Sequence, residues 1–376
     1  MNKPDTAPPF LFILKNGPIH GIDDYVGYQL EVLSRNFRGE LWVTGSFEAT
    51  VDIGRFRARV VKEPDRKTLA FFPRYYGQVM RRAREIDASV AGPKVVMTYD
   101  PFRNGLLGRL VKSRLGWPLI VEVNGMYGDP DNFVDSEGLL ATKVKPVLFG
   151  AVGRYVLRNA NGVRLLFNEQ LRGFAPRPRR AIVRQYFDGV PLERFEPGAS
   201  EKFVLSVGYP FYRKGIDILL QAYERIHAEF PDWRLVIIGH DLARHIQPVP
   251  AYASVVRGIP NKELADWMRR CGVLVLASRS EAMGRVLLEA AAAAKPRVAA
   301  AVGGTYTVIE PESDGLLFPK GDAAALAAAL RRLMADEPLR QKLGAAARAR
   351  TLAEFGADSY LRHVSGMVGD VLGQKA

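Results

Sequence analysis

The chain of 376 residues has one cysteine, Cys271, and five histidines, and both scarcities exclude classes of protein. A single cysteine cannot form an intramolecular disulfide, so a disulfide-held extracellular scaffold is excluded and a buried structural thiol in a reducing compartment is expected. The histidines at 20, 227, 240, 245 and 363 do not have the spacing of a zinc site. We therefore expect no metal site and no resident cofactor.

Long uncharged hydrophobic runs are also missing. The most apolar stretch, Val286–Val302, is interrupted by Glu289, Lys295 and Arg297, so it does not have the pattern of a membrane span. Residues 1–9 are polar and rich in proline, unlike a secretory signal. These features predict a cytoplasmic protein that could still lie peripherally on the inner face of the cell membrane.

What the chain has in excess is positive charge, with a formal net charge of +13. Residues 1–195 hold 30 Lys/Arg against 20 Asp/Glu, whereas residues 196–376 hold 23 against 20. A basic first half could face an anionic membrane surface, a phosphorylated substrate or nucleic acid, or it could simply be solvated. Because no helix-turn-helix, zinc-finger or RNP-type motif accompanies the charge, nucleic acid is not an expected partner.

Strand-like apolar runs alternate with helical patterns twice along the chain, which predicts parallel α/β sheets. The boundary between the two series is a stretch rich in Pro, Gly and charge at 188–200. We therefore predict one Rossmann-like domain over 1–195, a second over 196–355, and a terminal helix over 356–376 that could pack back on the first. Sheets of this kind bind ligands at the carboxyl ends of their strands.

The segment Ser278–Ala290 carries the first chemical signal. An apolar strand leads into a loop of small residues, and a helix is predicted to begin at about Gly284. The first amides of a helix point out of its end together with the positive end of its dipole, which suits a diphosphate. Glu281 and Glu289 could each accept hydrogen bonds from sugar hydroxyls. The alternative is a pair of ordinary helix and surface acids.

The segment Val207–Asp217 carries the second signal. Here another strand ends at Gly208, and two adjacent cations, Arg213 and Lys214, precede a predicted helix. A lysine point charge and an arginine fork both suit a pyrophosphate and could stabilise the charge on a departing nucleoside diphosphate. A solvated basic loop is the alternative.

Together these motifs resemble the retaining glycosyltransferases of family 4, which have the GT-B fold of two Rossmann-like, doubly wound domains facing across a cleft. The resemblance covers about Leu205–Leu330 and rests on the glutamate pair spaced by seven residues, the Lys-Gly loop, the Val302–Thr305 turn and the Asp314–Asp322 segment. It implies a nucleotide-diphosphate sugar as donor, and a carbohydrate or lipid-linked acceptor such as those of bacterial surface polysaccharide synthesis.

The resemblance also implies roles for individual residues. Lys214 and Glu281 are the expected catalytic residues, since Lys214 would hold the diphosphate and Glu281 the hydroxyls of the transferred sugar. Glu289 would hold the ribose. The remaining expected donor-binding residues are Gly208, Arg213, Met283, Gly284, Arg285, Val286 and Ile259, with Gly17 and Gly21 from the first half. Tyr209 stands where the family usually has Arg.

Two polar residues of the first half, Asn124 and Asp100, follow predicted strands and are expected sugar or acceptor contacts. Family members often have His at the position of Asn124, and an Asn cannot shuttle a proton at neutral pH. Asp100 could instead cap a turn. Two other functions stay open: a non-catalytic nucleotide-sugar-binding protein of the same fold, and another GT-B enzyme such as an epimerase.

Overall fold

The computed structural model describes residues 7–19, 25–64, 71–132, 134, 138–174, 180–240 and 242–373. The chain forms two compact units. Unit 1 comprises Met1–Gly125, Val147–Gly189 and Ala357–Ala376, and unit 2 comprises Met126–Pro146 and Val190–Gly356. Unit 1 is therefore built from three separate stretches of sequence, the last of which follows unit 2 along the chain.

Unit 1 contains an eight-stranded sheet in the order β3-β4-β2-β1-β5-β6-β7-β8. All neighbours are parallel except β3 and β4. The strands are β1 (Phe10–Ile19), β2 (Arg38–Gly45), β3 (Ala49–Ile53), β4 (Phe56–Lys62), β5 (Lys94–Thr98), β6 (Leu119–Val123), β7 (Gly162–Leu165) and β8 (Ile182–Gln185).

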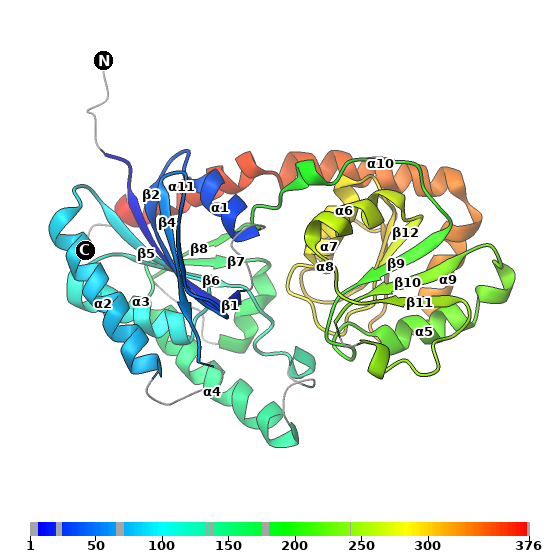
Figure 1. Ribbon diagram of the computed structural model, residues 1–376, viewed down its shortest axis with the longest axis horizontal. Helices are drawn as coiled ribbons and strands as arrows, with labels where there is room; N and C mark the ends of the chain where they lie inside the picture. Colours follow the sequence, from blue (N-terminus) through cyan, green and yellow to red (C-terminus); the bar gives the residue numbers. More distant parts are fainter. Residues whose placement is uncertain are drawn as a thin grey trace, which may run out of the picture. The chain divides into compact units, whose positions relative to one another are not determined.

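Helices cover both faces of this sheet (Figure 1). The helices α2 (Phe71–Ser89), α3 (Arg103–Leu115) and, from Val147 on, α4 (Gly138–Asn159) lie on one face, and α1 (Tyr25–Leu33) and α11 (Ala357–Gly373) lie on the other. A 3-10 segment, η2 (Asn168–Phe174), follows β7. The apolar face of α11 is buried in the core with the strands, since Tyr360, Val364 and Met367 are at most 2% exposed.

Two strands of this sheet, β3 and β8, have no apolar run that would mark them in the sequence. The side chains of β3 have almost no buried positions, and β8 alternates between half-buried and exposed positions. Edge strands of this kind lack the apolar run by which a buried strand is recognised in a sequence. The antiparallel β3 is an exception to the parallel pairing expected from the alternation of strands and helices.

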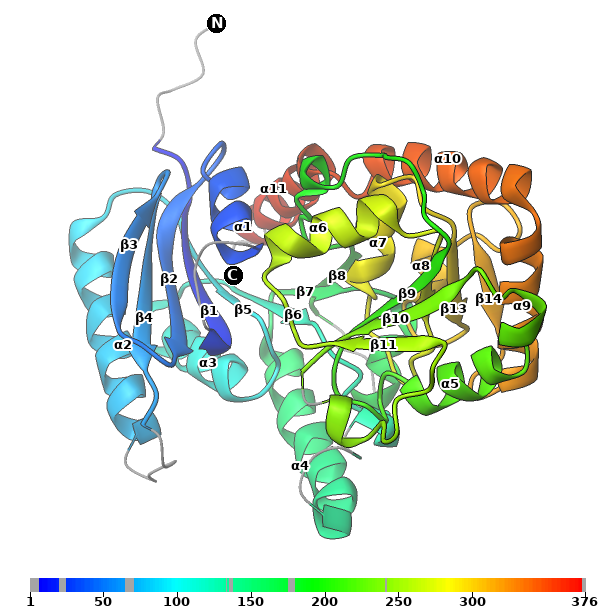
Figure 2. The ribbon, with the colours of Figure 1, turned by 45° about the vertical axis from the view of Figure 1, so that its right-hand side comes forward.

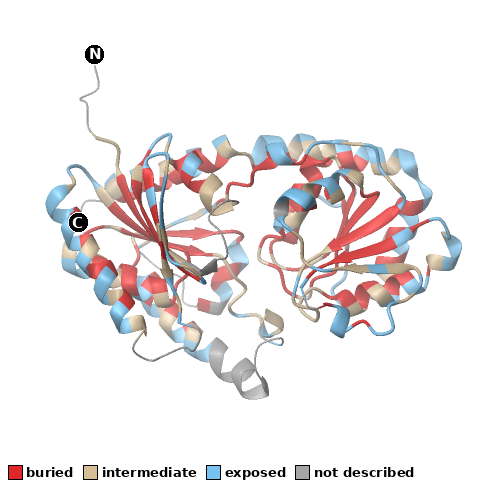
Figure 3. Ribbon diagram, viewed as in Figure 1, coloured by how far each residue is buried: buried red, intermediate tan, exposed pale blue. Residues whose placement is uncertain are grey.

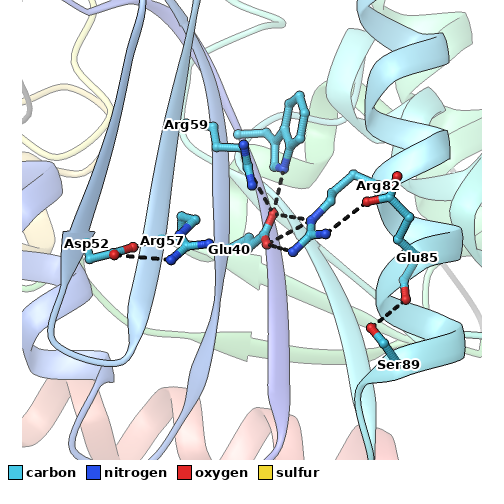
Figure 4. A network of polar contacts seen from close by, with 8 residues as sticks. Glu40, Asp52, Arg57, Arg59, Arg82, Glu85 and Ser89 are labelled. Atoms are coloured by element: carbon cyan, nitrogen blue, oxygen red, sulfur yellow. Dashed lines mark hydrogen bonds and ion pairs between the residues drawn. The ribbon is translucent and has the colours of Figure 1, made fainter.

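A buried carboxylate joins this sheet to helix α2 (Figure 4). Glu40 on β2 accepts hydrogen bonds from Arg82 of α2 at 2.5 and 2.9 Å, and from Arg59 of β4 at 3.3 Å. The indole of Trp42 donates to the same carboxylate at 3.2 Å. A buried charge is tolerated where it is paired and hydrogen-bonded, so this network fixes α2 on the sheet.

Unit 2 contains a six-stranded, wholly parallel sheet in the order β11-β10-β9-β12-β13-β14. Its strands are β9 (Phe203–Val207), β10 (Arg234–Ile238), β11 (Ala253–Val256), β12 (Val273–Leu276), β13 (Arg297–Ala300) and β14 (Leu316–Phe318). The strands β12 and β13 are buried throughout, and β9 is buried except at its last residue, as Figure 3 shows in red.

The helices of unit 2 also lie on both faces of their sheet (Figure 2). They are α5 (Ile216–Glu224), α6 (Asn261–Arg270), α7 (Arg285–Ala292), α8 (Thr305–Val308), α9 (Ala323–Ala335) and α10 (Glu337–Glu354), with 3-10 turns η1 (Pro130–Asn132), η3 (Leu192–Arg194), η4 (His227–Glu229) and η5 (Leu242–Arg244). Asp322 caps α9 by accepting the amides of Ala324 and Ala325.

The predicted burial of the single cysteine is confirmed. Cys271 is fully buried at the end of α6, and burial raises the pKa of its thiol to about 12. A thiol that stays protonated at neutral pH is a poor nucleophile, so its role is packing. Within the described parts of the chain, no helix combines the length and the apolar character that a bilayer crossing requires.

The strand order reverses once in the parallel part of each sheet. In unit 1 the reversal lies between β1 and β5, and in unit 2 it lies between β9 and β12. At such a point the connections leave in opposite directions, so the loops diverge and open a crevice at the carboxyl ends of the strands. The loops that follow β9 and β12 are those that the sequence singled out.

Candidate functional site

The candidate site in unit 2 is built from the two loops after β9 and β12. These strands are hydrogen-bonded neighbours, with Val204 opposite Val273. Because both strands are parallel, their loops leave the same edge of the sheet, and residues 208–215 come to lie beside residues 277–284. A glycine makes the approach possible: Gly215 has φ +63°, and a Cβ there would lie 2.0 Å from the carbonyl oxygen of Ala277.

The two predicted catalytic residues contact each other across these loops. Lys214 Nζ lies 2.6 Å from Glu281 Oε2, and the two side chains are only 13% and 10% exposed. Glu281 also accepts hydrogen bonds from Ser278 Oγ and from the backbone N–H of Gly284, each at 3.3 Å. Every donor around this carboxylate therefore stabilises its ionised form.

The surroundings fix the charge of Glu281. Burial by itself would raise the pKa of this carboxyl, but the charge and hydrogen bond of Lys214, with help from Arg213 and the Gly284 amide, outweigh it and hold the pKa below its ordinary value. Glu281 is thus an acceptor of hydrogen bonds at neutral pH and cannot serve as a general acid.

Helix α7 begins next to this pair. Its cap residue, Gly284, has φ +69°, which favours glycine, and the helix starts at Arg285 as predicted. The opening turns of a helix carry amides without partners inside the helix and the positive end of its dipole. Met283 and Glu289 are buried, Val286 is half-buried and Arg285 is exposed. The loop and the helix start place an anion-attracting terminus beside Lys214.

Gly208 makes room for the side chain of Lys214. It has φ +145°, and a Cβ there would lie within 2.9–3.2 Å of three carbons of the Lys214 side chain. The aliphatic stem of Lys214 therefore lies across Gly208, and only a residue without a side chain leaves room for it. Arg213 is half-buried and donates to the carbonyl oxygen of Tyr209 at 3.2 Å. The neighbouring Tyr209 is 43% exposed.

A residue that sequence reasoning missed, Arg279, joins the two loops. Its guanidinium donates to both carboxylate oxygens of Asp217, at 2.7 and 2.6 Å, and lies 4.0 Å from the ring centroid of Tyr212. It also donates to the Tyr212 carbonyl at 2.8 Å, and its amide donates to the Arg213 carbonyl at 2.8 Å. A bidentate, stacked arginine holds one geometry, so Arg279 fixes the backbone on both sides of Lys214.

The Val302–Thr305 turn packs directly on the Glu281 loop. A Cβ on Gly303 would lie 2.1 Å from the carbonyl oxygen of Glu281, and a Cβ on Gly304 would lie 1.9 Å from that of Ala282. The amide of Gly304 donates to the Glu281 carbonyl at 3.2 Å. These two glycines allow a backbone-to-backbone contact that any side chain would prevent. The turn therefore holds the backbone of the Glu281 loop in place.

Ile259 lies apart from the Lys214–Glu281 pair, in the loop after β11 at the edge of the sheet. It is half-buried, and its neighbour Gly258 contacts the ring of His240, where a Cβ would lie 2.4 Å from the nearest ring atom. The expected contribution of Ile259 to donor binding stays a prediction.

The predicted residues of unit 1 are placed at that unit's own strand ends. Gly17 lies within β1, whose pairing with β2 shifts register between Lys15 and Ile19, and Gly21 is outside the described residues. Asp100 is 1% exposed, and its Oδ1 accepts the amide of Phe102 at 2.7 Å. Burial raises the pKa of Asp100, against that hydrogen bond. This is the geometry of the turn-capping alternative.

Asn124 belongs to a buried ionic cluster that sequence reasoning also missed. Arg164 on β7 contacts the side-chain oxygen of Asn124, donates to Asp188 at 2.6 Å and lies 3.7 Å from Glu122. Arg164 and Glu122 are fully buried and directly opposite each other in the β6–β7 register. The Asn124 amide in turn donates to the Tyr99 carbonyl at 3.1 Å.

The signal for this cluster was one charge in each of two apolar strands, Leu-Ile-Val-Glu-Val and Gly-Val-Arg-Leu. Opposite charges in neighbouring buried strands predict an ion pair. Burial raises the pKa of Glu122, against the nearby charge of Arg164. Both ends of the Asn124 side chain are therefore engaged inside unit 1, and its expected contact with a sugar stays a prediction.

The expectation that the chain has no carboxylate motif for a cation needs one correction. The sequence contains an Asp-x-Asp triplet, Asp129–Asp131, which the expectation of no metal site left out of account. In the structure Asp131 forms an ion pair with Lys320 at 2.5 Å, and Asp129 accepts the amide of Asp131 at 3.1 Å. Among the residues that are described, no group of three or more His, Cys, Asp or Glu gathers as metal ligands. Metal independence itself stays a prediction.

Comparison with known proteins gives this arrangement a family context. A family model described as "Glycosyl transferases group 1" matches residues 192–350, which lie within unit 2. The chain is similar to a D-inositol 3-phosphate glycosyltransferase of Xylanimonas cellulosilytica, with 34% identity over 44% of this chain and 42% of that protein. It is also similar to an uncharacterized glycosyltransferase of Methanocaldococcus jannaschii, with 29% identity over 67% of this chain and 69% of that one.

The match therefore spans less than half the length of the Xylanimonas relative. Among solved structures, a sucrose-phosphate synthase from Thermosynechococcus elongatus aligns with a TM-score of 0.81 and 21% identity, covering 98% of this chain and 100% of that one. Anabaena HepE in complex with UDP and glucose aligns with a TM-score of 0.73 and 15% identity, covering 95% and 99%. The predicted GT-B fold class is confirmed.

Proposed function

We propose, on the premise that residues 192–350 belong to the group 1 glycosyl transferases, that this protein transfers a sugar from a nucleotide-diphosphate sugar to a carbohydrate or lipid-linked acceptor. The observation that carries the proposal is the Lys214–Glu281 pair beside the start of α7, at the point where the strand order of unit 2 reverses. This is where a parallel sheet offers loops to a nucleotide.

The donor would be held by groups of complementary charge. Lys214 and the first amides of α7 would bind the diphosphate, because both present positive charge at the same edge of the sheet. The solved neighbour from Anabaena is in complex with UDP and glucose, which makes UDP-glucose the first donor to try. Glu281, held ionised, would accept hydrogen bonds from the hydroxyls of the sugar, and Glu289 from those of the ribose.

The chemistry would depend on stabilising the leaving group. When the glycosidic bond to phosphate breaks, negative charge grows on the diphosphate, and Lys214 with the helix terminus would stabilise it without a proton and without a metal ion. A retaining transfer in which the departing phosphate itself accepts the proton of the acceptor hydroxyl needs no protein base at the position of Asn124. We therefore propose that the reaction retains the anomeric configuration. The basic residues of 1–195 support a peripheral location on an anionic membrane, where polysaccharide acceptors are assembled.

The proposal is tested first by binding and then by turnover. A panel of nucleotide sugars is screened by thermal shift, since a ligand at 100 times its dissociation constant adds about 2.7 kcal/mol to the stability of the native state. The stabilising donor is then incubated with the enzyme in the presence of EDTA, and donor hydrolysis and the anomeric configuration of the product are followed by NMR. Slow hydrolysis and a retained anomer support the proposal.

The alternatives predict different outcomes. A non-catalytic binding protein would be stabilised by a nucleotide sugar but would never hydrolyse it, and an epimerase would release a changed sugar nucleotide. The variant Glu281→Gln should weaken donor-specific turnover, whereas Glu263→Gln on the exposed start of α6 is the matched control and should leave it unchanged. Equal donor preference in both variants would mean that Glu281 is an ordinary acid near the end of a helix with no role in sugar binding.

A further inference from the structure

Helix α4 has an apolar face exposed to solvent in the part that belongs to unit 1. Val147 is 73% exposed, Leu148 56% and Tyr155 51%. Large apolar side chains are exposed singly on most proteins, but three on one short stretch of helix are unusual. The remaining exposed large apolar residues of the described chain are scattered over other elements.

The spacing shows that these residues share one side of the helix. Val147, Ala151, Tyr155 and Arg158 recur at intervals of four, four and three, and all four are exposed, whereas Val156 and Leu157 are buried. Residues three and four apart are neighbours on a helix surface. Residues 147–159 of helix α4 therefore pack one face into unit 1 and present the opposite face, apolar with an arginine at its end, to solvent.

The charged residues of these two helices have one sign. Helix α3 and residues 147–159 of α4 together contain six Lys/Arg and no Asp/Glu, and one of the six, Arg103, lies 3.8 Å from Glu63. The two helices are in contact: a Cβ on Gly105 of α3 would lie 2.8 Å from Val156 of α4, and Lys112 donates to the Asn159 carbonyl at 2.8 Å. Another partly exposed apolar side chain, Leu106, lies on α3. Apolar exposure and an excess of positive charge thus occur on the same pair of helices.

We propose that the α3–α4 surface docks on an anionic lipid bilayer, with Val147, Leu148 and Tyr155 inserted at the headgroup level and the lysines and arginines contacting lipid phosphates. A helix that lies in a membrane interface combines an apolar face with cationic residues and few acids, and tyrosine favours the headgroup region. This inference deepens the proposed peripheral location and rests on it, but it uses no residue of the donor site.

Other partners fit the surface less well. Nucleic acid would engage the cations but would leave the aliphatic side chains of Val147 and Leu148 unused. A second copy of the same surface would bring cations against cations, which opposes self-association. An anionic bilayer satisfies both the apolar and the charged residues.

The test measures co-sedimentation of the full chain with vesicles, in the absence of donor and acceptor. We expect the protein to bind vesicles that contain phosphatidylglycerol and not vesicles of phosphatidylcholine alone, and to be released by high salt. The variant Val147→Gln/Leu148→Gln should lower the partition coefficient about tenfold or more. The variant Arg154→Gln/Arg158→Gln should lower it at least about tenfold through lost attraction to anionic lipid.

Matched variants from unit 2 control for general effects. Val249→Gln and Leu352→Gln remove apolar side chains that are 43% and 45% exposed, and Arg225→Gln/Lys342→Gln removes two exposed cations. These controls should bind vesicles like the parent. The proposal is overturned if the α4 variants and the controls lose binding equally, or if the protein binds both vesicle types alike. It is also overturned if the protein forms dimers that only the α4 variants abolish.

Donor binding by the same variants separates this inference from the proposed reaction. Thermal shift with the donor is recorded on the α4 variants and should be unchanged, because these variants do not alter the loops after β9 and β12. A protein that binds donor but never binds anionic vesicles contradicts the membrane proposal alone. A protein that binds vesicles but no nucleotide sugar contradicts the proposed function alone.

Discussion

The two units each collect charged side chains at the carboxyl ends of their strands, but the two clusters differ in exposure and in what they hold. In unit 1, Arg164 and Glu122 are fully buried, and the guanidinium of Arg164 donates hydrogen bonds to the Tyr186 carbonyl and the Asp188 carboxylate. In unit 2, Lys214 and Glu281 form one partly accessible pair beside a helix terminus. The first cluster is closed within the protein and maintains the structure of its sheet, whereas the second would, under the proposed function, exchange its partner for a ligand.

The largest expected effect breaks the cluster of unit 1. Arg164→Met should lower the free energy of unfolding by about 3–5 kcal/mol, because it leaves buried carboxylates without their counter-charge. Chemical denaturation measures the loss. Unchanged stability would mean that Arg164 does not hold the carboxyl ends of β6 and β7 together. The structural role assigned to the cluster of unit 1 would then be wrong.

The next effect concerns turnover. Lys214→Ala should reduce kcat roughly 100- to 1000-fold, the usual cost of removing one group that stabilises charge in the transition state, while changing the midpoint of unfolding far less than Arg164→Met does. Lys262→Ala, an exposed lysine at the start of α6, is the matched control. Steady-state kinetics with the donor found by thermal shift decides the matter, and full turnover in Lys214→Ala contradicts the leaving-group role.

A smaller effect is expected at the connection between the loops. Arg279→Lys keeps the positive charge but loses the bidentate contact with Asp217 and the stacking on Tyr212. We expect kcat/KM to fall about tenfold, equivalent to roughly 1.4 kcal/mol, because Lys214 is held less firmly. A purely structural arginine would lower the melting temperature without changing kcat/KM once the protein is folded.

The smallest effect is on the pH dependence of stability, which should have opposite signs for Glu281 and Glu122. The pKa of Glu281 is lowered in the folded state, so its contribution to stability is present above the unfolded pKa and is lost as pH falls through the folded pKa. The pKa of Glu122 is raised, so its contribution is present below the unfolded pKa and is lost as pH rises through the folded pKa.

Melting temperatures measured from acid to neutral pH test this difference. Relative to the parent, Glu281→Gln should become less stable as pH rises, and Glu122→Gln should become more stable. Curves that move in the same direction for both variants would show that the two carboxylates experience similar environments.

Local patterns predicted the site of unit 2 because each part of it follows a recognisable strand. The runs before Gly208 and Ser278 are apolar, and a glycine next to a cation or a carboxylate marks the turn into the helix. These signals are short in sequence, so the helix starts at Ile216 and Arg285 lay close to their predicted positions.

What the sequence did not reveal depends on contacts between distant segments. The pairing of Glu122 with Arg164 requires the register between two strands that a long helix separates along the chain. The contact of Gly303 with the Glu281 carbonyl requires β13 to lie beside β12. Exposure on α4 could not be predicted either, because Val147 and Leu148 look like core residues until the packing of the helix is known.

The composition of unit 1 has a consequence for how the protein is made. Helix α11 contributes Tyr360, Val364 and Met367 to the core of unit 1, yet the ribosome synthesises it only after the whole of unit 2. Domains generally fold as units while the chain emerges. Part of the core of the eight-stranded sheet therefore stays uncovered until the last helix has been synthesised, and the sequence of unit 2 is complete before that of unit 1.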